Sequence, residues 1–273
     1  MTNPPATGDH LRRHYRDATR FNARVQLHVR FSVNKQGWQR WVFDQVTWPT
    51  TGRVLELGCG PGYLWAANRG RLPAGLALLL TDFSPGMLAE TRRVLAWTGH
   101  PFAYAAANAQ SIPLADATCA VVIANHMLYH VPDRAAALAE IRRVLRPGGC
   151  LYASTLGGGH MAEVRALLRR FQHGAGYDHY FLRGIGFNLE TGADELAPWF
   201  PSVRLRRYDD ALVVTEAAPL VAYIRSLLPL PEGVPGDPRS DLTAFIQQEL
   251  DTHGPLHIST DTGLFIAGPG AAP

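Results

Sequence analysis

Short apolar runs alternate with longer amphipathic runs through the middle of the chain, between about residues 50 and 157. The apolar runs are typical of strands: RVLELG, ALLLTDF, PFAYAAAN, CAVVIAN and CLYASTL. The runs typical of helices are AANRGRL, PGMLAETRRVLAWTG and DRAAALAEIRRVL, and the last of them stops at Pro147-Gly148-Gly149. This alternation predicts an α/β fold, with a mostly parallel sheet that carries helices on both faces. Ligands of such sheets bind at the carboxyl ends of the strands.

The two flanks of this region have a different pattern. Residues 1–50 are rich in Arg, His and aromatic residues, and their spacing predicts an N-terminal helical cap that packs over the first edge of the sheet. The main domain would then cover residues 51–273. Gly and Pro interrupt the segment from about 158 to 253, which predicts a lid with two helical pieces, PLVAYIRSLL and DLTAFIQQELDTHG. After it, HISTDTGLFIAG predicts one closing strand.

Composition narrows the class of protein. The chain has 273 residues, of which 47% are hydrophobic, and no apolar run reaches the roughly 18 residues of a membrane span. With no secretory signal at the N-terminus, we expect a cytoplasmic protein without a membrane partner. The net charge of +3 is spread along the chain, so no nucleic-acid partner is expected. The three cysteines form no CxxC pair, which argues against a disulfide framework or a structural zinc site.

Three glycines follow the first apolar run, in VLELGCGPGYLW. A dinucleotide fingerprint, G-x-G-x-x-G, would need its third glycine at the position of Tyr63. Glu56, two residues before the first glycine, would also be a poor neighbour for a pyrophosphate. It suits a ligand with cationic groups, such as S-adenosylmethionine. Asp82 ends the next strand, where its carboxylate could accept both ribose hydroxyls.

Five segments, in order, resemble the class I S-adenosylmethionine-dependent methyltransferases over roughly residues 50–157: VLELGCGPG, LLLTDFSPGML, NAQSIPL, CAVVIANHMLYHVPD and RVLRPGGCLYAST. The resemblance implies a Rossmann-like sheet of seven strands with the last one antiparallel, preceded by an insertion at about 209–253. Two departures from the family pattern are Asn108, where Asp is common, and Cys119-Ala120 in place of Phe-Asp. The cofactor residues that the resemblance implies are Glu56, Gly58, Cys59, Gly60, Gly62, Asp82, Phe83, Met87, Asn108, Ala109, Gln110 and Asn125.

The carboxyl end of the fourth strand would border the transferred methyl group. His126 and His130 lie four residues apart there, so on one helical turn they would share a face. Either could be a general base or could orient the acceptor; the alternative is a structural histidine. A metal site is not expected, because only Asp133 follows at ligand spacing. The resemblance also implies Tyr15 as a latch from an N-terminal helix, unless Tyr15 merely packs against the sheet.

Acceptor contacts would come from the aromatic-rich flanks, which suggest an organic molecule with apolar or ring surface. The candidates are His28, Phe31, Trp38, Trp41, Tyr129, Tyr177, His179 and Tyr180, and each could instead be a packing residue. The leading hypothesis is methyl transfer to an O, N or C atom of a small molecule. The Arg- and Ala-rich composition is typical of a GC-rich genome, which suggests bacterial secondary metabolism. The expected assembly state includes a homodimer. The alternative is a protein of the same fold that binds S-adenosylmethionine or S-adenosylhomocysteine in a non-methylating catalytic or regulatory role.

Overall fold

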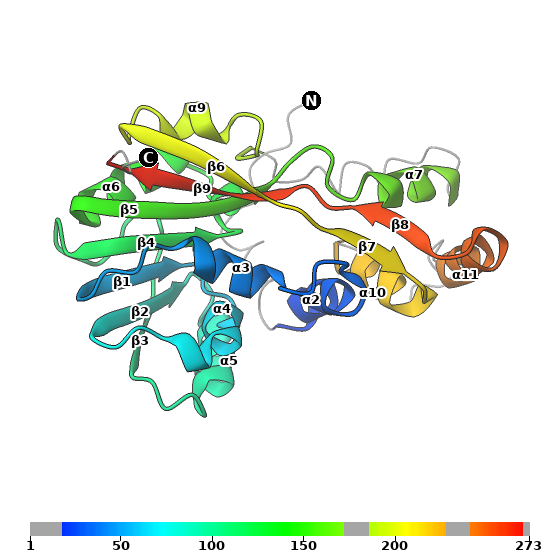
Figure 1. Cartoon of the computed structure of the whole chain (residues 1–273), viewed down its shortest axis with the longest axis horizontal. Coiled ribbons are helices and arrows are strands. Elements are labelled where there is room, and N and C mark those ends of the chain that lie inside the picture. The colour runs from blue at the N-terminus through cyan, green and yellow to red at the C-terminus, as the bar shows by residue number, and fades with distance from the viewer. Residues whose placement is uncertain (1–17, 172–185, 228–240, 270–273) are drawn as a thin grey trace.

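The computed structural model describes residues 18–171, 186–227 and 241–269. Its main feature is a seven-stranded sheet in the order β3-β2-β1-β4-β5-β9-β6 (Figure 1). Strand β9 runs antiparallel to both of its neighbours, and the pairs among β1 to β5 are parallel. The expected seven-stranded α/β sheet is therefore confirmed. Its strands are β1 (Gly52–Leu57), β2 (Leu76–Asp82), β3 (Phe102–Ala106), β4 (Cys119–Asn125), β5 (Leu145–Leu156), β6 (Ser202–Tyr208) and β9 (Thr262–Gly268).

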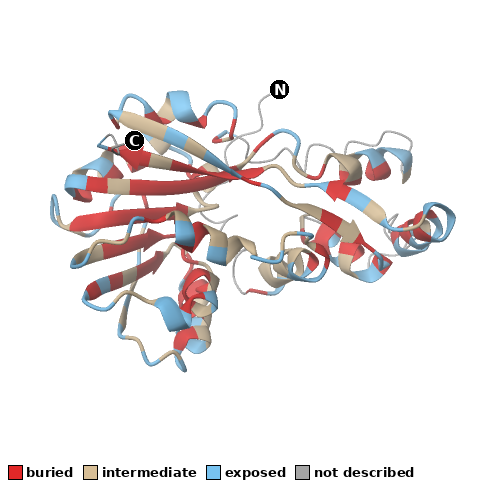
Figure 2. Ribbon diagram, in the orientation of Figure 1, coloured by how far each residue is buried: buried red, intermediate tan, exposed pale blue. Residues whose placement is uncertain are grey.

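Helices cover both faces of the sheet, and the side chains of β4 show how. Val121 and Ile123 belong to a core with α3 (Trp38–Gln45), α4 (Tyr63–Ala67) and α5 (Pro85–Leu95). The alternate residues, Val122 and Ala124, belong to a second core with α6 (Arg134–Val144) and α9 (Gly192–Leu196). Figure 2 shows the central strands buried along most of their length. This two-sided burial explains why the central strands read as continuous apolar runs.

Local signals determine where the helices begin. Ser84 accepts a hydrogen bond from the Met87 amide at 3.3 Å, with Pro85 in the first turn of α5. Asp133 caps α6 in the same way, at 2.9 Å from the Ala136 amide. The helix expected at AANRGRL is wrong in detail: α4 begins earlier and ends at Ala67, and a 3-10 turn, η1 (Arg69–Arg71), follows.

A second layer of structure, which we call the lid, has its own apolar core. It contains α2 (Thr19–Phe31), α7 (Ala162–Phe171), α10 (Ala217–Leu227), α11 (Leu242–His253) and a two-stranded sheet of β7 (Ala211–Val214) and β8 (Leu256–Ser259). Figure 1 shows β7 continuing the direction of β6 and β8 leading into β9, so that a long ribbon joins the sheet to the lid. None of the helices in the described ranges is long and apolar enough to span a bilayer.

Two expectations about these flanks are wrong. The single closing strand is divided between β8 and β9, which pair in different sheets. Among the N-terminal residues that the structure describes, neither helix packs over the first edge of the sheet, which is β3: α2 packs against α10 and β7, whereas α3 packs against α4. The proposed boundary at residue 50 stays a prediction, and the packing groups α2 with the lid.

Candidate active site

A cavity of about 780 Å³ lies between the carboxyl edge of the sheet and the lid. One part of its wall comes from the loops that follow β1, β2, β3 and β4, and the other from α2, α3, α7, α10 and the β6–β7 connection. Its volume falls in the range of ligand pockets, and it lies where open α/β sheets bind ligands. We call the two parts the sheet end and the lid end.

The glycine loop after β1 forms the floor of the sheet end. Gly58, Gly60 and Gly62 have φ values of 66°, 53° and 78°, a left-handed conformation that glycine adopts without strain. A Cβ on Gly58 would lie 2.8 Å from the Cβ of Met127, whereas one on Gly60 would meet only the Phe21 ring, at 4.0 Å. The backbone at Gly60 is therefore open to close approach by a ligand.

Gly62→Ala should destabilise the protein by about 2 kcal/mol, because an alanine there adopts a left-handed conformation and also meets its neighbours. Its Cβ would lie 2.8 Å from Thr91 Cγ2 and 3.2 Å from Leu95 Cδ1. Gly99→Ala is the matched control, since Gly99 has φ 71° but no atom within 4 Å of the added Cβ. Urea unfolding should show a clearly smaller loss for the control. Equal losses would mean that the contacts with α5 contribute nothing.

Two carboxylates stand beside this loop. Asp82 accepts from the Gly60 amide at 2.9 Å and from the Ser84 amide at 2.8 Å. Burial raises the pKa of Asp82, and these backbone hydrogen bonds oppose the rise. Glu56 is 2% exposed and accepts from the Trp65 indole at 2.5 Å. Burial raises the pKa of Glu56 to about 7; the Trp65 hydrogen bond opposes the rise, and the negative charge of Asp82 adds to it.

The remaining cofactor candidates line the same end. Phe83 and Met87 follow β2, and the segment 107–110 follows β3. The side-chain oxygen of Asn108 accepts from the Gln110 amide at 3.0 Å, so this turn fixes the side-chain amide of an expected cofactor residue. Cys59 is buried with its sulfur 3.6 Å from Thr91 Oγ1.

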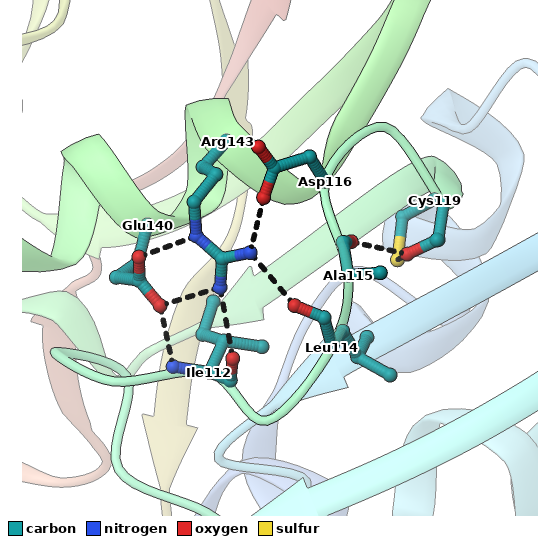
Figure 3. A network of polar contacts seen from close by, with 8 residues as sticks. Ile112, Leu114, Ala115, Asp116, Cys119, Glu140 and Arg143 are labelled. Atoms are coloured by element: carbon teal, nitrogen blue, oxygen red, sulfur yellow. Dashed lines mark hydrogen bonds and ion pairs between the residues drawn. The ribbon is translucent and has the colours of Figure 1, made fainter.

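A polar network anchors the segment that leaves this turn (Figure 3). The Arg143 guanidinium, on α6, donates to the carbonyls of Ile112 and Leu114 at 2.9 and 2.7 Å and to Asp116 at 2.7 Å. It also forms a two-point ion pair with Glu140, and Glu140 accepts from the Ile112 amide at 2.7 Å. The network ties the chain after residue 110 to α6, and so supports the position of the Asn108 turn.

The tip of β4 is held by a chain of hydrogen bonds. Ser154, on β5, donates to the Asn125 side-chain oxygen at 2.6 Å and accepts from the His126 amide at 2.9 Å. The Trp38 indole donates to the same Asn125 oxygen at 3.2 Å. His126 has φ 54°, a left-handed conformation that stores about 1 to 3 kcal/mol of strain in a residue other than glycine. Strain of this kind clusters at functional sites.

The two candidate bases differ from expectation in their geometry. His126 and His130 do not share a helical turn, since His126 lies directly after β4 and His130 ends the 3-10 turn η2 (Leu128–His130). Both line the cavity. The pKa of His126 is lowered to about 3, mainly by burial and to a smaller extent by charge on His28 and Arg24. His126 is therefore neutral near pH 7 and only a weak base, which favours a role in orienting the acceptor.

Only some of the residues expected to contact the acceptor line the cavity. His28, Trp38 and Tyr129 line the cavity. Phe31 and Trp41 do not, which corrects the expectation of direct contact: Phe31 is buried in the lid core, and Trp41 lies behind Trp38 at a ring distance of 5.2 Å. Four further candidates lie outside the described residues: Tyr15, Tyr177, His179 and Tyr180.

Several cavity residues were missed by sequence reasoning. They come from segments distant in the chain: Arg24, His160, Arg165 and Tyr223. The buried Ser154, which holds Asn125, was missed as well. A signal existed for two of them. Arg24 lies four residues before His28 and so shares its helical face, and His160 follows β5, whose carboxyl end borders that of β4. Nothing in the local pattern marked Arg165 or Tyr223, whose helices read as ordinary amphipathic segments.

The sheet end fits S-adenosylmethionine by its chemistry. Glu56 and Asp82 are both carboxylates, which suit the cationic groups and the ribose of this cofactor, and the open backbone at Gly60 lies beside them. The side-chain oxygen of Gln39 is buried in the same cavity wall without a hydrogen-bond partner, and so offers a further acceptor. In the described ranges, no three His, Cys, Asp or Glu residues are grouped as metal ligands.

Comparisons with known proteins agree with this chemistry. A family model described as a methyltransferase domain matches residues 55–153. The chain is 34% identical over 121 residues to the ubiquinone/menaquinone biosynthesis C-methyltransferase of Desulfotalea psychrophila, covering 44% of this chain and 48% of the relative. It is 42% identical over 100 residues to the trans-aconitate 2-methyltransferase of Methylobacterium nodulans, covering 36% of each. The matched region thus spans about half or less of these relatives.

Solved structures match over more of the chain at low identity. The [4+2]-cyclase SpnF has a TM-score of 0.59 at 14% identity and is covered over 98% of both chains. The YcgJ protein of Bacillus subtilis has a TM-score of 0.58 at 14% identity, covering 85% of this chain and 98% of that one. These likenesses support the fold. The matched domain and the relatives support a class I methyltransferase with S-adenosylmethionine as its cofactor.

Proposed function

We propose that this protein transfers a methyl group from S-adenosylmethionine to an O, N or C atom of a small organic molecule. The observation that carries the proposal is a continuous cavity that joins the acidic glycine-loop end to a lid end lined with aromatic and polar side chains. The names of the relatives, a quinone-pathway C-methyltransferase and a trans-aconitate methyltransferase, support a small acceptor. A role in bacterial secondary metabolism and a homodimer remain part of the proposal.

The bound cofactor supplies a methyl group activated by its sulfonium, so the protein mainly has to align the acceptor and exclude water. Asp82 and Glu56 would hold the cofactor at the sheet end. Trp38 would provide a flat apolar wall for the acceptor, because its ring lies 5.0 Å from that of His126. His126, with its backbone held by Ser154, would orient the acceptor atom through a hydrogen bond.

His126→Ala should lower turnover by about ten- to a hundred-fold while leaving cofactor affinity unchanged, since the side chain would act on the acceptor. The assay follows a deuterated methyl group from S-adenosylmethionine into candidate acceptors by mass spectrometry. His257→Ala, an exposed histidine on β8, is the matched control and should keep full activity. Full activity in the His126 variant would contradict its role in orientation.

The alternative is a protein that binds the cofactor without transferring its methyl group. It draws support from SpnF, a neighbour named as a [4+2]-cyclase, and from the weak basicity of His126. The same labelling experiment separates the two functions. Transfer of the label to an acceptor supports the methyltransferase, whereas tight cofactor binding without transfer to any acceptor supports the alternative.

A further inference from the structure

The lid end of the cavity contains a cation with no anionic partner. Arg165, on α7, lines the cavity, and its guanidinium donates to two backbone carbonyls, those of Gly158 (2.7 Å) and His160. No ion pair to Arg165 is found within the described ranges of the chain. Carbonyl contacts orient a guanidinium without neutralising it, and its remaining N–H groups are available to a ligand.

A second guanidinium group, that of Arg24, also lies at the lid end of the cavity. Arg24, on α2, lines the cavity, and both guanidinium groups act on the hydroxyl of Tyr223, which lies on α10. Burial raises the pKa of Tyr223 to about 12, while the charges of Arg24 and Arg165 act in the opposite direction. Both positive charges are therefore close to one buried hydroxyl, which can itself donate a hydrogen bond to an anion.

The histidines of this end are neutral and add a donor. His160 Nδ1 accepts from the Asp261 amide at 3.3 Å, so in the neutral ring the proton lies on Nε2. Burial lowers the pKa of His160, and the positive charge of the Arg165 guanidinium acts in the same direction. The His28 ring stacks on that of His160, with centroids 6.1 Å apart.

The nearby carboxylates are engaged elsewhere. Asp210 lines the cavity, but its oxygens accept from the Ser32 hydroxyl at 2.6 Å, the Asn34 amide at 3.0 Å and the Ala211 amide at 2.8 Å. Glu163, on the same helix as Arg165, accepts from the amide and the hydroxyl of Ser259 at 2.8 and 2.7 Å. Neither carboxylate forms an ion pair with Arg165 within the described residues, so the Arg165 guanidinium is available to a ligand carboxylate.

We propose that the methyl acceptor is an organic acid whose carboxylate binds at the lid end, paired with Arg165 and close to Arg24. A guanidinium matches a carboxylate in two-point geometry, and the pair gains strength inside a protein cavity. The inference rests on the proposed function and narrows it, because it assigns the acceptor a chemical class. It also gives a role to the half-buried Arg165 guanidinium, which lines the cavity and forms no ion pair within the described residues.

The test uses the full chain saturated with S-adenosylhomocysteine, which cannot react. Calorimetry then compares benzoate and hexanoate with their amides, and benzoate with phenyl phosphate. The acids should bind at least about ten-fold more tightly than the amides. Arg165→Gln should weaken acid binding roughly ten- to a hundred-fold without changing amide binding. Arg169→Gln removes an equal charge one helical turn away, at an exposed position outside the cavity, and should change neither.

Arg165→Lys is the second variant, because it keeps the charge if the glutamine variant fails to fold; it should retain part of the acid affinity. Equal binding of acids and amides, no binding of either acid, or unchanged acid affinity in both Arg165 variants would overturn the inference. Tighter binding of phenyl phosphate than of benzoate would overturn the carboxylate assignment. Failure of the wild type to bind S-adenosylhomocysteine would instead overturn the proposed function, and this first step isolates that result.

Discussion

Replacing Asp82 with alanine should weaken S-adenosylmethionine binding by about 1.5–3 kcal/mol, or roughly ten- to a hundred-fold. A charged acceptor at the end of β2 would be lost, together with the hydrogen bond that holds the Gly60 amide at 2.9 Å. Both changes lie at the sheet end, so the loss should appear as weaker cofactor affinity in calorimetry.

Two further variants separate these contributions. Asp82→Asn keeps one carbonyl oxygen for a backbone amide and loses the charge, so it should lie between the wild type and the alanine variant. Asp251→Asn removes an exposed carboxylate on α11, outside the cavity, and should leave the affinity unchanged. Unchanged affinity in Asp82→Ala would remove Asp82 from the cofactor site.

Glu56 should make the protein less stable as the pH rises. Its pKa is about 7 in the folded state, against a usual value of 4.5. The folded protein therefore holds this proton more tightly than the unfolded chain does. The protonated Glu56 carboxyl contributes fully to the stability of the folded state below pH 4.5. This contribution to stability is lost as the pH rises toward about 7. The difference across the window is about 3 kcal/mol.

Glu56→Gln isolates this contribution, because glutamine keeps a carbonyl oxygen for the Trp65 indole but does not titrate. Its stability, measured by urea unfolding, should fall less between pH 5 and pH 8 than that of the wild type. Glu90→Gln is the control: the hydrogen bond with Arg93 lowers the pKa of Glu90, so this variant should leave the stability profile between pH 5 and pH 8 unchanged. An identical pH profile for the wild type and Glu56→Gln would contradict the raised pKa.

The sheet end could be predicted from the sequence because each of its parts is local. Gly58, Gly60 and Gly62 follow one strand directly, and Asp82 ends the next, so the parallel sheet brings them to one edge. The pattern also identified the tip of β4. It could not identify Ser154, whose role depends on its pairing with Asn125 across two strands.

The lid end depends on contacts between distant segments. His28 and His160 stack although they lie on α2 and beside α7, and no local pattern indicates that these segments meet. The division between β8 and β9 was hidden for a related reason. It occurs in the polar run Ser259-Thr260-Asp261-Thr262, and contacts with distant segments produce it. The Thr260 hydroxyl donates to the Asp210 carbonyl, and the Gly157 amide donates to the Asp261 carbonyl.

The central claim is that the cavity binds S-adenosylmethionine, and titration calorimetry of the wild-type protein, freed of copurified ligand, tests it most directly. Saturable binding of S-adenosylmethionine and S-adenosylhomocysteine, each with one site per chain and an affinity in the micromolar range, is the predicted result. No heat of binding with either ligand would contradict the claim, and would leave the glycine loop and Asp82 without the ligand that their chemistry fits.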